Sequence, residues 1–485
     1  MNPLQLQLVL DPSDRAQMNL AQRIEQAMDP HEQLQRISLQ QWKPSPCRSP
    51  GSAGQAPIVL LICPAAWYQH WGAGFGFPEG MLMVVEWING GAYDISAAAS
   101  WQAVWQQDTA ARFAVLTSDA GSADNGSLHC KVQMAIPLLR RWPNQQQRFL
   151  QATGDYLIWW LRLCESKQTL HTIAPFGPVR HPSARRLRRR QVWMTNGRWF
   201  TQRATSRLLR PHQGTHNHWH VGVARLNPSN QELDRFFHLP PRGSDWFADP
   251  FLIQHGAHTW LFCERWNSAK AKGVIDLFEL SHAGLQSIGT VLEEPFHLSF
   301  PRIICSQGHW YATVESSANG DVRLYRAVVF PTIWRFERQL LHDQASIDPI
   351  LIQSADGWWL IANSQSSQAL PRETAPELHL FHSPDLLHEP FTAHATSPLL
   401  VDSACGRNGG LLTIAGQLHR VSQCTGIDNA YGEAIQLHRI DQLDRQHYAE
   451  THVNPRWLRR LPEQLKATHL HTLNNSDNWL TFDYR

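Results

Sequence analysis

The stretch WFADPFLI, residues 246–253, decides the fold because related stretches return twice downstream. In each copy a proline (Pro250, Pro301 or Pro349) precedes a short apolar run, then a loop with a glycine, then a second run that contains tryptophan. A weaker copy begins at Gly409-Gly410. Two runs rich in β-branched and aromatic residues, joined by a glycine-containing turn, predict a β-hairpin.

The spacing of these copies predicts a β-propeller. The three prolines lie 51 and 48 residues apart, which is close to the period of a kelch-like blade. One hairpin cannot bury its apolar face alone, so successive units are expected to stack around a common axis. We interpret residues 193–485 as five blades, in a ring closed by strands at Trp219–Leu226 and Trp479–Asp483. We expect each proline at the first position of an innermost strand, where no ladder donor is needed.

The region before the propeller predicts a different architecture. Residues 1–165 alternate expected strands and helices, including helices at Leu128–Arg141 and Arg148–Glu165, which predicts a small α/β domain. Residues 166–192 are expected to be a basic linker, with six arginines in Arg180–Arg190. That stretch could also make peripheral contact with anionic lipids. The fold class is therefore multidomain, a C-terminal five-bladed β-propeller preceded by a small α/β domain.

Composition narrows the functional classes. The net charge is +2 and only 17% of the 485 residues are charged, which argues against nucleic acid as a partner. The eight cysteines have no zinc-like spacing, and no cofactor motif is found, so we expect neither metal nor cofactor. The N-terminus lacks the pattern of a signal peptide, and no apolar run reaches 18 residues. A cytoplasmic location is the resulting expectation.

Several later motifs resemble one known domain. They are HLSFPRIICSQGHWYATVESS (297–317), VRLYRAVVFPTIW (322–334), DPILIQSADGWWLIANS (348–364), GRNGG (406–410), LHRVSQC (418–424) and THLHTLN (468–474). Together they resemble the N-terminal domain family of plant glucosamine inositolphosphorylceramide transferase. The resemblance implies a five-bladed propeller similar to glycoside hydrolase family 43, without the separate glycosyltransferase domain of the plant enzyme. Residues 70–96 are faintly similar to the degenerate formyltransferase-like region of some relatives.

Three carboxylates are the candidate catalytic residues. Asp249 and Asp348 precede two of the repeat prolines, at the expected mouth of the central channel. The resemblance places them where family 43 hydrolases have two of three essential acids. The corresponding start of a later blade, Gly406–Asn408, has no acid, so Glu315 is the substitute candidate. Glycoside cleavage needs a base or nucleophile and a protonated partner. The alternative is that each aspartate only caps a turn.

A second group of residues could bind substrate. Arginines at the mouth suit a phosphate or carboxylate group, although ion pairs with the channel acids would explain them equally well. Aromatic rings could stack on a sugar, and side-chain amides and hydroxyls could bind its hydroxyl groups. The candidates are Arg302, Arg407, Arg420, Gln423, Tyr431, Trp246 and His297, with Trp266, His469 and His471 as weaker ones. The alternating His216, His218 and His220 could hold a metal, but a solvated face is preferred.

These residues predict a carbohydrate-handling propeller that binds a glycosyl or phospho-glycosyl substrate in glycoconjugate or surface-polysaccharide biosynthesis. The expected partners are a sugar, a nucleotide sugar or a glycolipid head group, and a glycosyltransferase protein could act beside it. One alternative is an active glycoside hydrolase or glycosyl-transferring enzyme that uses Asp249, Glu315 and Asp348. The other is a non-catalytic interaction scaffold.

Overall fold

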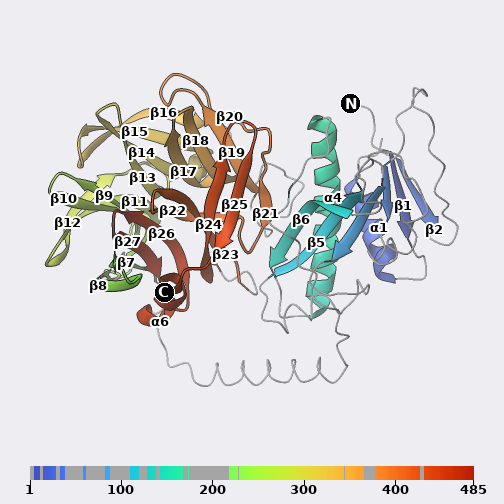
Figure 1. The fold of residues 1–485 in the computed structure, drawn as a ribbon, viewed down its shortest axis with the longest axis horizontal. Coiled ribbons are helices and arrows are strands. Elements are labelled where there is room, and N and C mark those ends of the chain that lie inside the picture. Colours follow the sequence, from blue (N-terminus) through green and yellow to red (C-terminus); the bar gives the residue numbers. More distant parts are fainter. Residues whose placement is uncertain are drawn as a thin grey trace.

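The second half of the chain folds into a five-bladed β-propeller (Figure 1). The computed structural model describes residues 218–485, except residues 228, 343–344, 365–376 and 427–430. Before residue 218 it describes the helices and strands given below together with residues 28 and 173. The propeller that the repeats predict is therefore confirmed, within residues 218–485.

Each of the first two blades is a four-stranded antiparallel sheet. The first blade consists of β9 (Trp246–His255), β10 (His258–Asn267), β11 (Lys272–Ser281) and β12 (Gly284–Leu292). The second consists of β13 (Ser299–Ser306), β14 (His309–Ser316), β15 (Asp321–Val329) and β16 (Ile333–Leu341). The tryptophan-containing runs of the repeat form the second strands, as the hairpin prediction requires.

The third and fourth blades follow the same order along the chain. The third consists of β17 (Ser346–Ser354), β18 (Gly357–Ser364), β19 (Glu377–Ser383) and β21 (Leu400–Asp402), with β20 (Thr392–Ala393) also paired to β19. The fourth consists of β22 (Arg407–Ile414), β23 (Gln417–Cys424), β24 (Ala434–Leu443) and β25 (Tyr448–Val453).

The fifth blade closes the ring with strands from both ends of the propeller. It pairs β26 (Leu470–Ser476) and β27 (Trp479–Tyr484) with β7 (His220–Asn227) and β8 (Glu232–Leu239). Strand β27 lies antiparallel to β7, with Tyr484 opposite His220. The predicted closure is confirmed, and it removes the open edges that a linear array of blades would leave.

The innermost strand of every blade contains a β-bulge. In β9 the pairing with β10 shifts between Ala248 and Phe251, so Asp249 and Pro250 have no ladder partner. The same shift occurs in β13, β17, β22 and β26. The repeat prolines therefore lie inside their strands, at the bulge, and not at the first strand position as expected. A bulge accepts a proline for the same reason as the first position of a strand does. Neither position needs the backbone N–H group that proline lacks.

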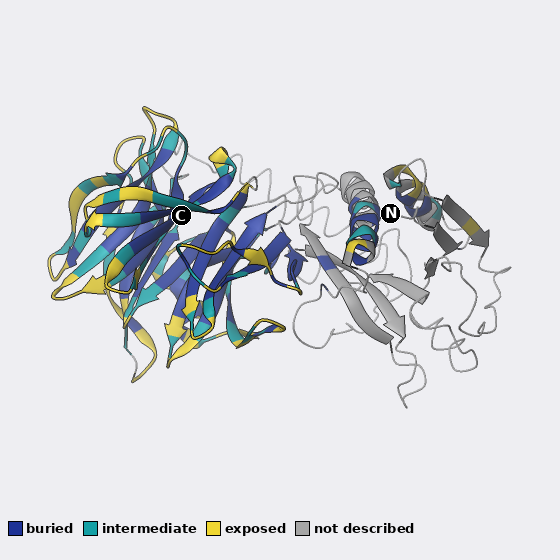
Figure 2. Ribbon diagram, turned by 90° about the horizontal axis from the view of Figure 1, so that it is seen from above, coloured by how far each residue is buried: buried dark blue, intermediate teal, exposed yellow. Residues whose placement is uncertain are grey.

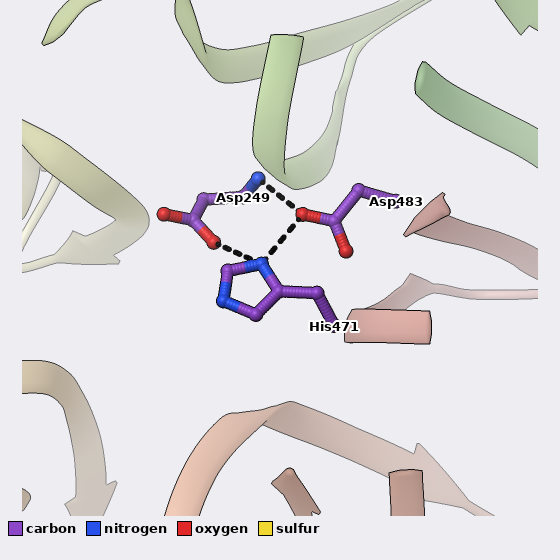
Figure 3. A group of neighbouring side chains, drawn as sticks. All are labelled: Asp249, His471 and Asp483. Carbon is purple, nitrogen blue, oxygen red and sulfur yellow. Dashed lines mark hydrogen bonds and ion pairs between the residues drawn. The ribbon is translucent and has the colours of Figure 1, made fainter. Parts of the chain in front are cut away.

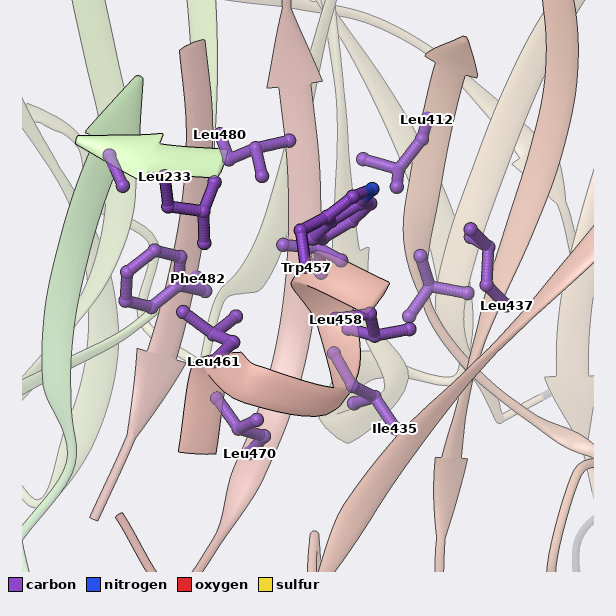
Figure 4. Close-up of a cluster of buried hydrophobic side chains, with 13 residues drawn as sticks. Leu233, Leu412, Ile435, Leu437, Trp457, Leu458, Leu461, Leu470, Leu480 and Phe482 are labelled. Carbon is purple, nitrogen blue, oxygen red and sulfur yellow. The ribbon is translucent and has the colours of Figure 1, made fainter. Parts of the chain in front are cut away.

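The hydrophobic core is divided into layers between adjacent blades. Figure 2 shows the buried residues of the propeller in dark blue. One layer joins Phe251 and Phe262 of the first blade to Ile303 and Tyr325 of the second. Another lies between the fourth and fifth blades and is completed by helix α6 (Arg456–Leu465). The buried side chains of α6 are Trp457, Leu458 and Leu461, which point into this layer (Figure 4).

In the first half of the chain, the described residues form six strands and two helices. Strands β1 (Gln5–Leu10), β2 (Gln33–Ser38), β3 (Ile58–Leu61) and β4 (Leu82–Trp87) pair in parallel, and β5 (Ala110–Ser118) and β6 (Leu128–Pro137) continue the sheet antiparallel. Helix α1 is Arg15–Ala27 and α4 is Trp142–Lys167. Strand β6 also pairs in parallel with β21 of the third blade, with Met134 opposite Val401.

One prediction in this half is wrong. Residues 128–141 were expected to form a helix, but Leu128–Pro137 is strand β6. The apolar side chains alternate with period two (Leu128, Cys130, Val132, Met134 and Ile136), which is the pattern of a strand. The second expected helix, Arg148–Glu165, is present as α4 but begins at Trp142, with Pro143 in its first turn, where a proline is tolerated.

Candidate functional site

The bulges bring side chains from separate blades to the mouth of the central channel. Asp249, Phe300 and Asp348 occupy the same bulge position in successive blades, and each has a positive φ of 49–50°. This left-handed conformation is costly for residues with a Cβ atom, so surrounding contacts must hold it in place. The side chains of Asp249 and Asp348 are both buried.

Asp249 is linked to the fifth blade through a histidine and an aspartate (Figure 3). The Nδ1 atom of His471 lies 2.9 Å from Oδ2 of Asp483 and 3.3 Å from Oδ1 of Asp249. The backbone amide of Asp249 donates to the same Asp483 oxygen at 2.9 Å. All three side chains are buried. One histidine therefore joins two acids that are 234 residues apart in the sequence.

The contact network continues from His471 to the fourth and third blades. The ring of His471 also bonds the hydroxyl group of Tyr431 through Nε2. The guanidinium of Arg407 lies over the Tyr431 ring, 4.7 Å from its centre. Nε of Arg407 donates to Oδ2 of Asp348 at 2.6 Å, and Nε2 of Gln423 donates to the same oxygen at 3.4 Å. Arg407, Gln423 and Tyr431 thus lie together with Asp348, and Arg407 makes the ion pair with a channel acid that the sequence left open as an alternative.

Glu315 completes the group of three predicted acids. Its Oε2 atom accepts a hydrogen bond from the backbone amide of Asp348 at 2.9 Å, and its Oε1 atom accepts one from Ser317 at 2.8 Å. The exposed fractions of Asp249, Glu315 and Asp348 are only 5%, 8% and 2%. Three acids from the first, second and third blades therefore meet in one buried polar network.

Burial changes the protonation of these acids. It raises the pKa of Asp249 to about 8, and the charges of Asp483, Asp348 and Glu315 act in the same direction, against His471. Burial and the charge of Asp348 raise the pKa of Glu315 to about 7. For His471, burial alone would lower the pKa, but Asp483 and Asp249 raise it overall. At neutral pH the group can therefore both donate and accept protons.

Glu264 is a further acid of this group that the sequence did not single out. It is 4% exposed, and burial followed by the charges of Asp249 and Glu315 raises its pKa well above the usual range. It follows the second apolar run of its repeat, as Glu315 does in the next repeat. An alignment of the repeats on the ends of these apolar runs would have found it. Asp483 has the same place in the last repeat.

Two of the predicted aromatic residues form a pair beside Glu264. The rings of Trp246 and Trp266 stack with centres 5.8 Å apart and planes within 6° of parallel. The ring of His297 lies 6.1 Å from that of Trp266, and its Nε2 is 3.6 Å from Oε1 of Glu264. Burial lowers the pKa of His297. Trp246, Trp266 and His297 therefore form a connected aromatic group, which reaches Glu264 through His297.

The structure does not bring Arg420 to this group. Its side chain is fully buried in the fourth blade, where Nε and Nη2 donate to the two oxygens of Glu450 at 2.8 and 2.6 Å. Tyr448 donates to Glu450 at 2.7 Å in the same buried cluster. Arg420 was expected to grip an anion, but its charge is already neutralised inside the blade.

Arg302 also departs from its prediction. Its Nε atom donates to the carbonyl oxygen of Leu351 at 2.8 Å, and its guanidinium lies 5.3 Å from the centre of the Phe251 ring. Burial lowers its pKa to about 10. These contacts join the first, second and third blades, so in this structure Arg302 bridges blades and contacts none of the carboxylates named above.

The described residues contain one set of side chains that could hold a metal ion, namely Asp249, His471 and Asp483. Their candidate ligand atoms lie within 4.8 Å of one another, and a nitrogen with two carboxylates suits a divalent cation. In this structure these atoms are instead bonded to one another. Of the alternating histidines, His220 begins β7 and stacks on Tyr484, whereas His216 lies outside the described residues.

Comparisons with known proteins agree with the sequence motifs. Residues 240–468 match the family model described as "Glucosamine inositolphosphorylceramide transferase 1, N-terminal". The protein named Glucosamine inositolphosphorylceramide transferase 1 from Oryza sativa subsp. indica is 32% identical over 217 residues, 44% of this chain and 28% of that protein. Its namesake from Arabidopsis thaliana is 30% identical over 215 residues, 43% of this chain and 27% of that protein. The chain thus matches less than a third of each relative.

Solved structures with a similar arrangement of strands include carbohydrate-active enzymes. The GH43_1 enzyme from Xanthomonas citri, complexed with xylose, is 15% identical with a TM-score of 0.36, covering 50% of this chain and 82% of that one. A family 117 glycoside hydrolase from Zobellia galactanivorans is 13% identical with a TM-score of 0.35, covering 50% and 76%.

The stretch 70–96, with its formyltransferase-like resemblance, lies largely outside the described residues, as does Arg180–Arg190. Within the described part of the chain, none of the helices has the length and apolar character needed to cross a bilayer. The family match and the motifs at 297–317 and 348–364 coincide on the propeller. Residues 240–468 therefore belong to the N-terminal family of glucosamine inositolphosphorylceramide transferase 1.

Proposed function

We propose that the channel mouth binds a glycosyl or phospho-glycosyl substrate in the synthesis of a glycoconjugate or surface polysaccharide. The observation that carries the proposal is the convergence of Asp249, Glu315, Asp348 and Arg407 from four blades on one buried network. Sugar sites combine carboxylates, which accept hydrogen bonds from hydroxyl groups, with aromatic rings on which a sugar stacks. Trp246 and Trp266 are such rings.

The chemistry of the mouth differs between its two sides. The first blade supplies Trp246, Trp266 and Glu264, which suit a sugar ring. The fourth blade supplies Arg407, which retains further donor groups beyond its bond to Asp348 and suits a phosphate or carboxylate. A sugar phosphate, nucleotide sugar or glycolipid head group would use both sides. The names of the relatives, which refer to glucosamine and inositolphosphorylceramide, are in line with this class.

A second candidate function is catalysis of glycoside cleavage or glycosyl transfer. The observation that favours it is the pKa of Glu315, which burial raises to about 7, near that of an effective proton donor at neutral pH. Asp249 is less suited to be the base, because burial raises its pKa to about 8 and its Oδ2 atom accepts the amide of Phe300 at 3.2 Å. We therefore place binding ahead of catalysis.

The remaining parts of the proposal concern the surroundings of the propeller. We propose that residues 1–165 form a small α/β domain that presents or orders the substrate, and that residues 166–192 are a basic linker. A glycosyltransferase partner would supply the transfer chemistry, in the cytoplasm. If the protein is instead only a scaffold, the channel mouth will bind no sugar.

The test is a binding experiment on the full-length chain. Calorimetry would compare glucose, glucosamine, glucose 1-phosphate and UDP-N-acetylglucosamine on wild type and Asp249→Asn. We expect at least one ligand to bind the wild type and to bind Asp249→Asn at least about tenfold more weakly, which corresponds to about 1.4 kcal/mol. The matched control is Asp441→Asn, at an exposed aspartate that pairs with Arg439 on the outer side of the fourth blade. Equal binding by all three proteins would contradict the assignment of the site.

A further inference from the structure

We propose that Glu264 is the carboxyl group of the channel mouth that contacts the bound sugar, on the ring platform of Trp246 and Trp266. The proposal rests on the proposed function, because it names one contact of the same site. It follows from a comparison of equivalent positions in the five blades.

The second strand of every blade carries a polar residue near the height of the bulge: Glu264, Glu315, Asn363, Gln423 and Asp483. Four of the five hold an inner strand by its backbone. Glu315 accepts the amide of Asp348 at 2.9 Å, and Asp483 accepts the amide of Asp249 at 2.9 Å.

The other two, Asn363 and Gln423, both bind the backbone of Asn408. The amide of Asn408 donates to Oδ1 of Asn363 at 2.7 Å, and Nε2 of Gln423 donates to the carbonyl oxygen of Asn408 at 2.5 Å. These polar residues therefore have a structural role, since each satisfies a backbone group that the bulge has released from the ladder.

Glu264 is the exception to this pattern. The backbone amide that it would bind by analogy, that of Phe300, instead donates to Oδ2 of Asp249 at 3.2 Å. Oε1 of Glu264 is buried without a hydrogen-bond partner among the described residues. The nearby His297 is 3.6 Å away and uses Nδ1 to accept the amide of Gly273 at 2.8 Å. Glu264 thus lacks the hydrogen bond to the backbone of an inner strand that its four counterparts make.

A buried carboxyl oxygen without a hydrogen-bond partner is a cost to the fold, because its desolvation is not compensated. A ligand would supply the missing partner. Trp266 is two residues from Glu264 on the same strand, so both side chains are on one face of β10. Trp246 lies opposite Trp266 and stacks on it, and both rings are partly exposed. A sugar resting on these rings would place a hydroxyl group within reach of Glu264.

The experiment first compares stability without ligand. Glu264→Gln preserves shape and removes no hydrogen bond within the protein, so its melting temperature should equal or exceed that of wild type. Asn363→Ala is the matched variant, because it removes the corresponding structural contact of the third blade. We expect a clear decrease in its melting temperature. A decrease of similar size in Glu264→Gln would overturn the proposal by showing a structural role.

The second measurement is calorimetric binding of glucose, glucosamine, glucose 1-phosphate and UDP-N-acetylglucosamine. For any of these that binds wild type, Glu264→Gln and Trp266→Ala should each bind about tenfold or more weakly, while Asn363→Ala retains affinity at a temperature where it is folded. If wild type binds and Glu264→Gln binds equally well, the contact is rejected but the site stands. If wild type binds none of them, the site and this contact are both rejected.

Discussion

Asp249 combines a structural role with a chemical one. Its Oδ2 atom accepts the amide of Phe300, and its own amide donates to Asp483, so it joins the fifth, first and second blades. Burial raises its pKa to about 8, yet a protonated carboxyl group keeps an oxygen that can accept the Phe300 amide. The side chain can therefore change its protonation while its hydrogen bond to Phe300 is retained.

The raised pKa values predict that the protein loses stability as pH rises. Asp249 and Glu315 bind a proton more tightly in the folded chain, so their contribution is fully present below about pH 4, the range of ordinary carboxyl pKa values. It is lost as pH rises through about 7 for Glu315 and about 8 for Asp249. The raised pKa of His471 acts in the same direction, from its ordinary value upward.

Urea unfolding at pH 6 and pH 9 would measure this effect. We expect a lower free energy of unfolding at pH 9, and a smaller decrease in Asp249→Asn, because the amide does not ionise. Asp441→Asn should keep the wild-type decrease, since burial contributes little to that exposed group. A wild-type stability that is unchanged or greater at pH 9 would show that these acids are ionised in the folded protein.

At the scale of the element, the inner strand with its bulge both joins adjacent blades and positions residues of the site. The bulge releases backbone groups from the ladder, and side chains of the second strands or of neighbouring bulges bind them. In the fourth blade the bulge lies at Gly409, and the next residue, Gly410, has a φ of 132°. A Cβ atom on Gly410 would lie 2.1 Å from the carbonyl oxygen of Leu473. The fourth and fifth blades approach each other closely at Gly410 because no side chain separates them there.

This close approach predicts that Gly410→Ala is strongly destabilising. The substitution combines an unfavourable positive φ with a clash against backbone, so we expect a loss of about 3 kcal/mol or more, in the range of exceptional single substitutions. The control is Gly416→Ala, which has a φ of 77° but meets nothing within 4 Å. It should cost only about 1 kcal/mol, the penalty for the left-handed conformation. Chemical denaturation would compare the two, and equal losses would refute the steric argument.

At the scale of the whole molecule, the ring depends on strands from its two ends. Strand β27 lies between β26 and β7 in the fifth blade, so it joins β26 to β7 and β8, the first strands of the propeller. Phe482 of β27 is fully buried in the layer that α6 completes (Figure 4). Closure of the ring therefore makes the stability of the propeller depend on strand β27.

Removal of residues 479–485 is predicted to abolish cooperative unfolding of the propeller. The deletion opens the fifth blade and leaves the amide of Asp249 without Asp483. We expect a broad thermal transition by circular dichroism and loss of sugar binding. As a comparison, Phe336→Ala removes a side chain that is 48% exposed on an outer strand and should change stability by less than about 1 kcal/mol. A sharp transition near the wild-type temperature in the truncated chain would contradict the role of closure.

The sequence could predict the blades because the signals for a hairpin are local. Alternating apolar runs, a glycine turn and a proline where no ladder donor is needed all act within about a dozen residues. The repeat then places Asp249 and Asp348 at equivalent positions without knowledge of the fold. The helix expected at Leu128–Arg141 was wrong, because this segment contains strand β6. Its apolar side chains alternate with the period of two that predicts a strand, so the sequence did contain the correct signal.

What only the tertiary structure decided is which partner each polar side chain finds. Arg407 and Arg420 both lie within recognisable motifs, yet one bonds Asp348 and the other is buried against Glu450. Glu264 and Glu315 have the same place in their repeats, yet only Glu315 bonds the next inner strand. The physical reason is that blade-to-blade contacts join residues far apart in the chain. Their geometry is therefore fixed by ring closure, and no local pattern records it.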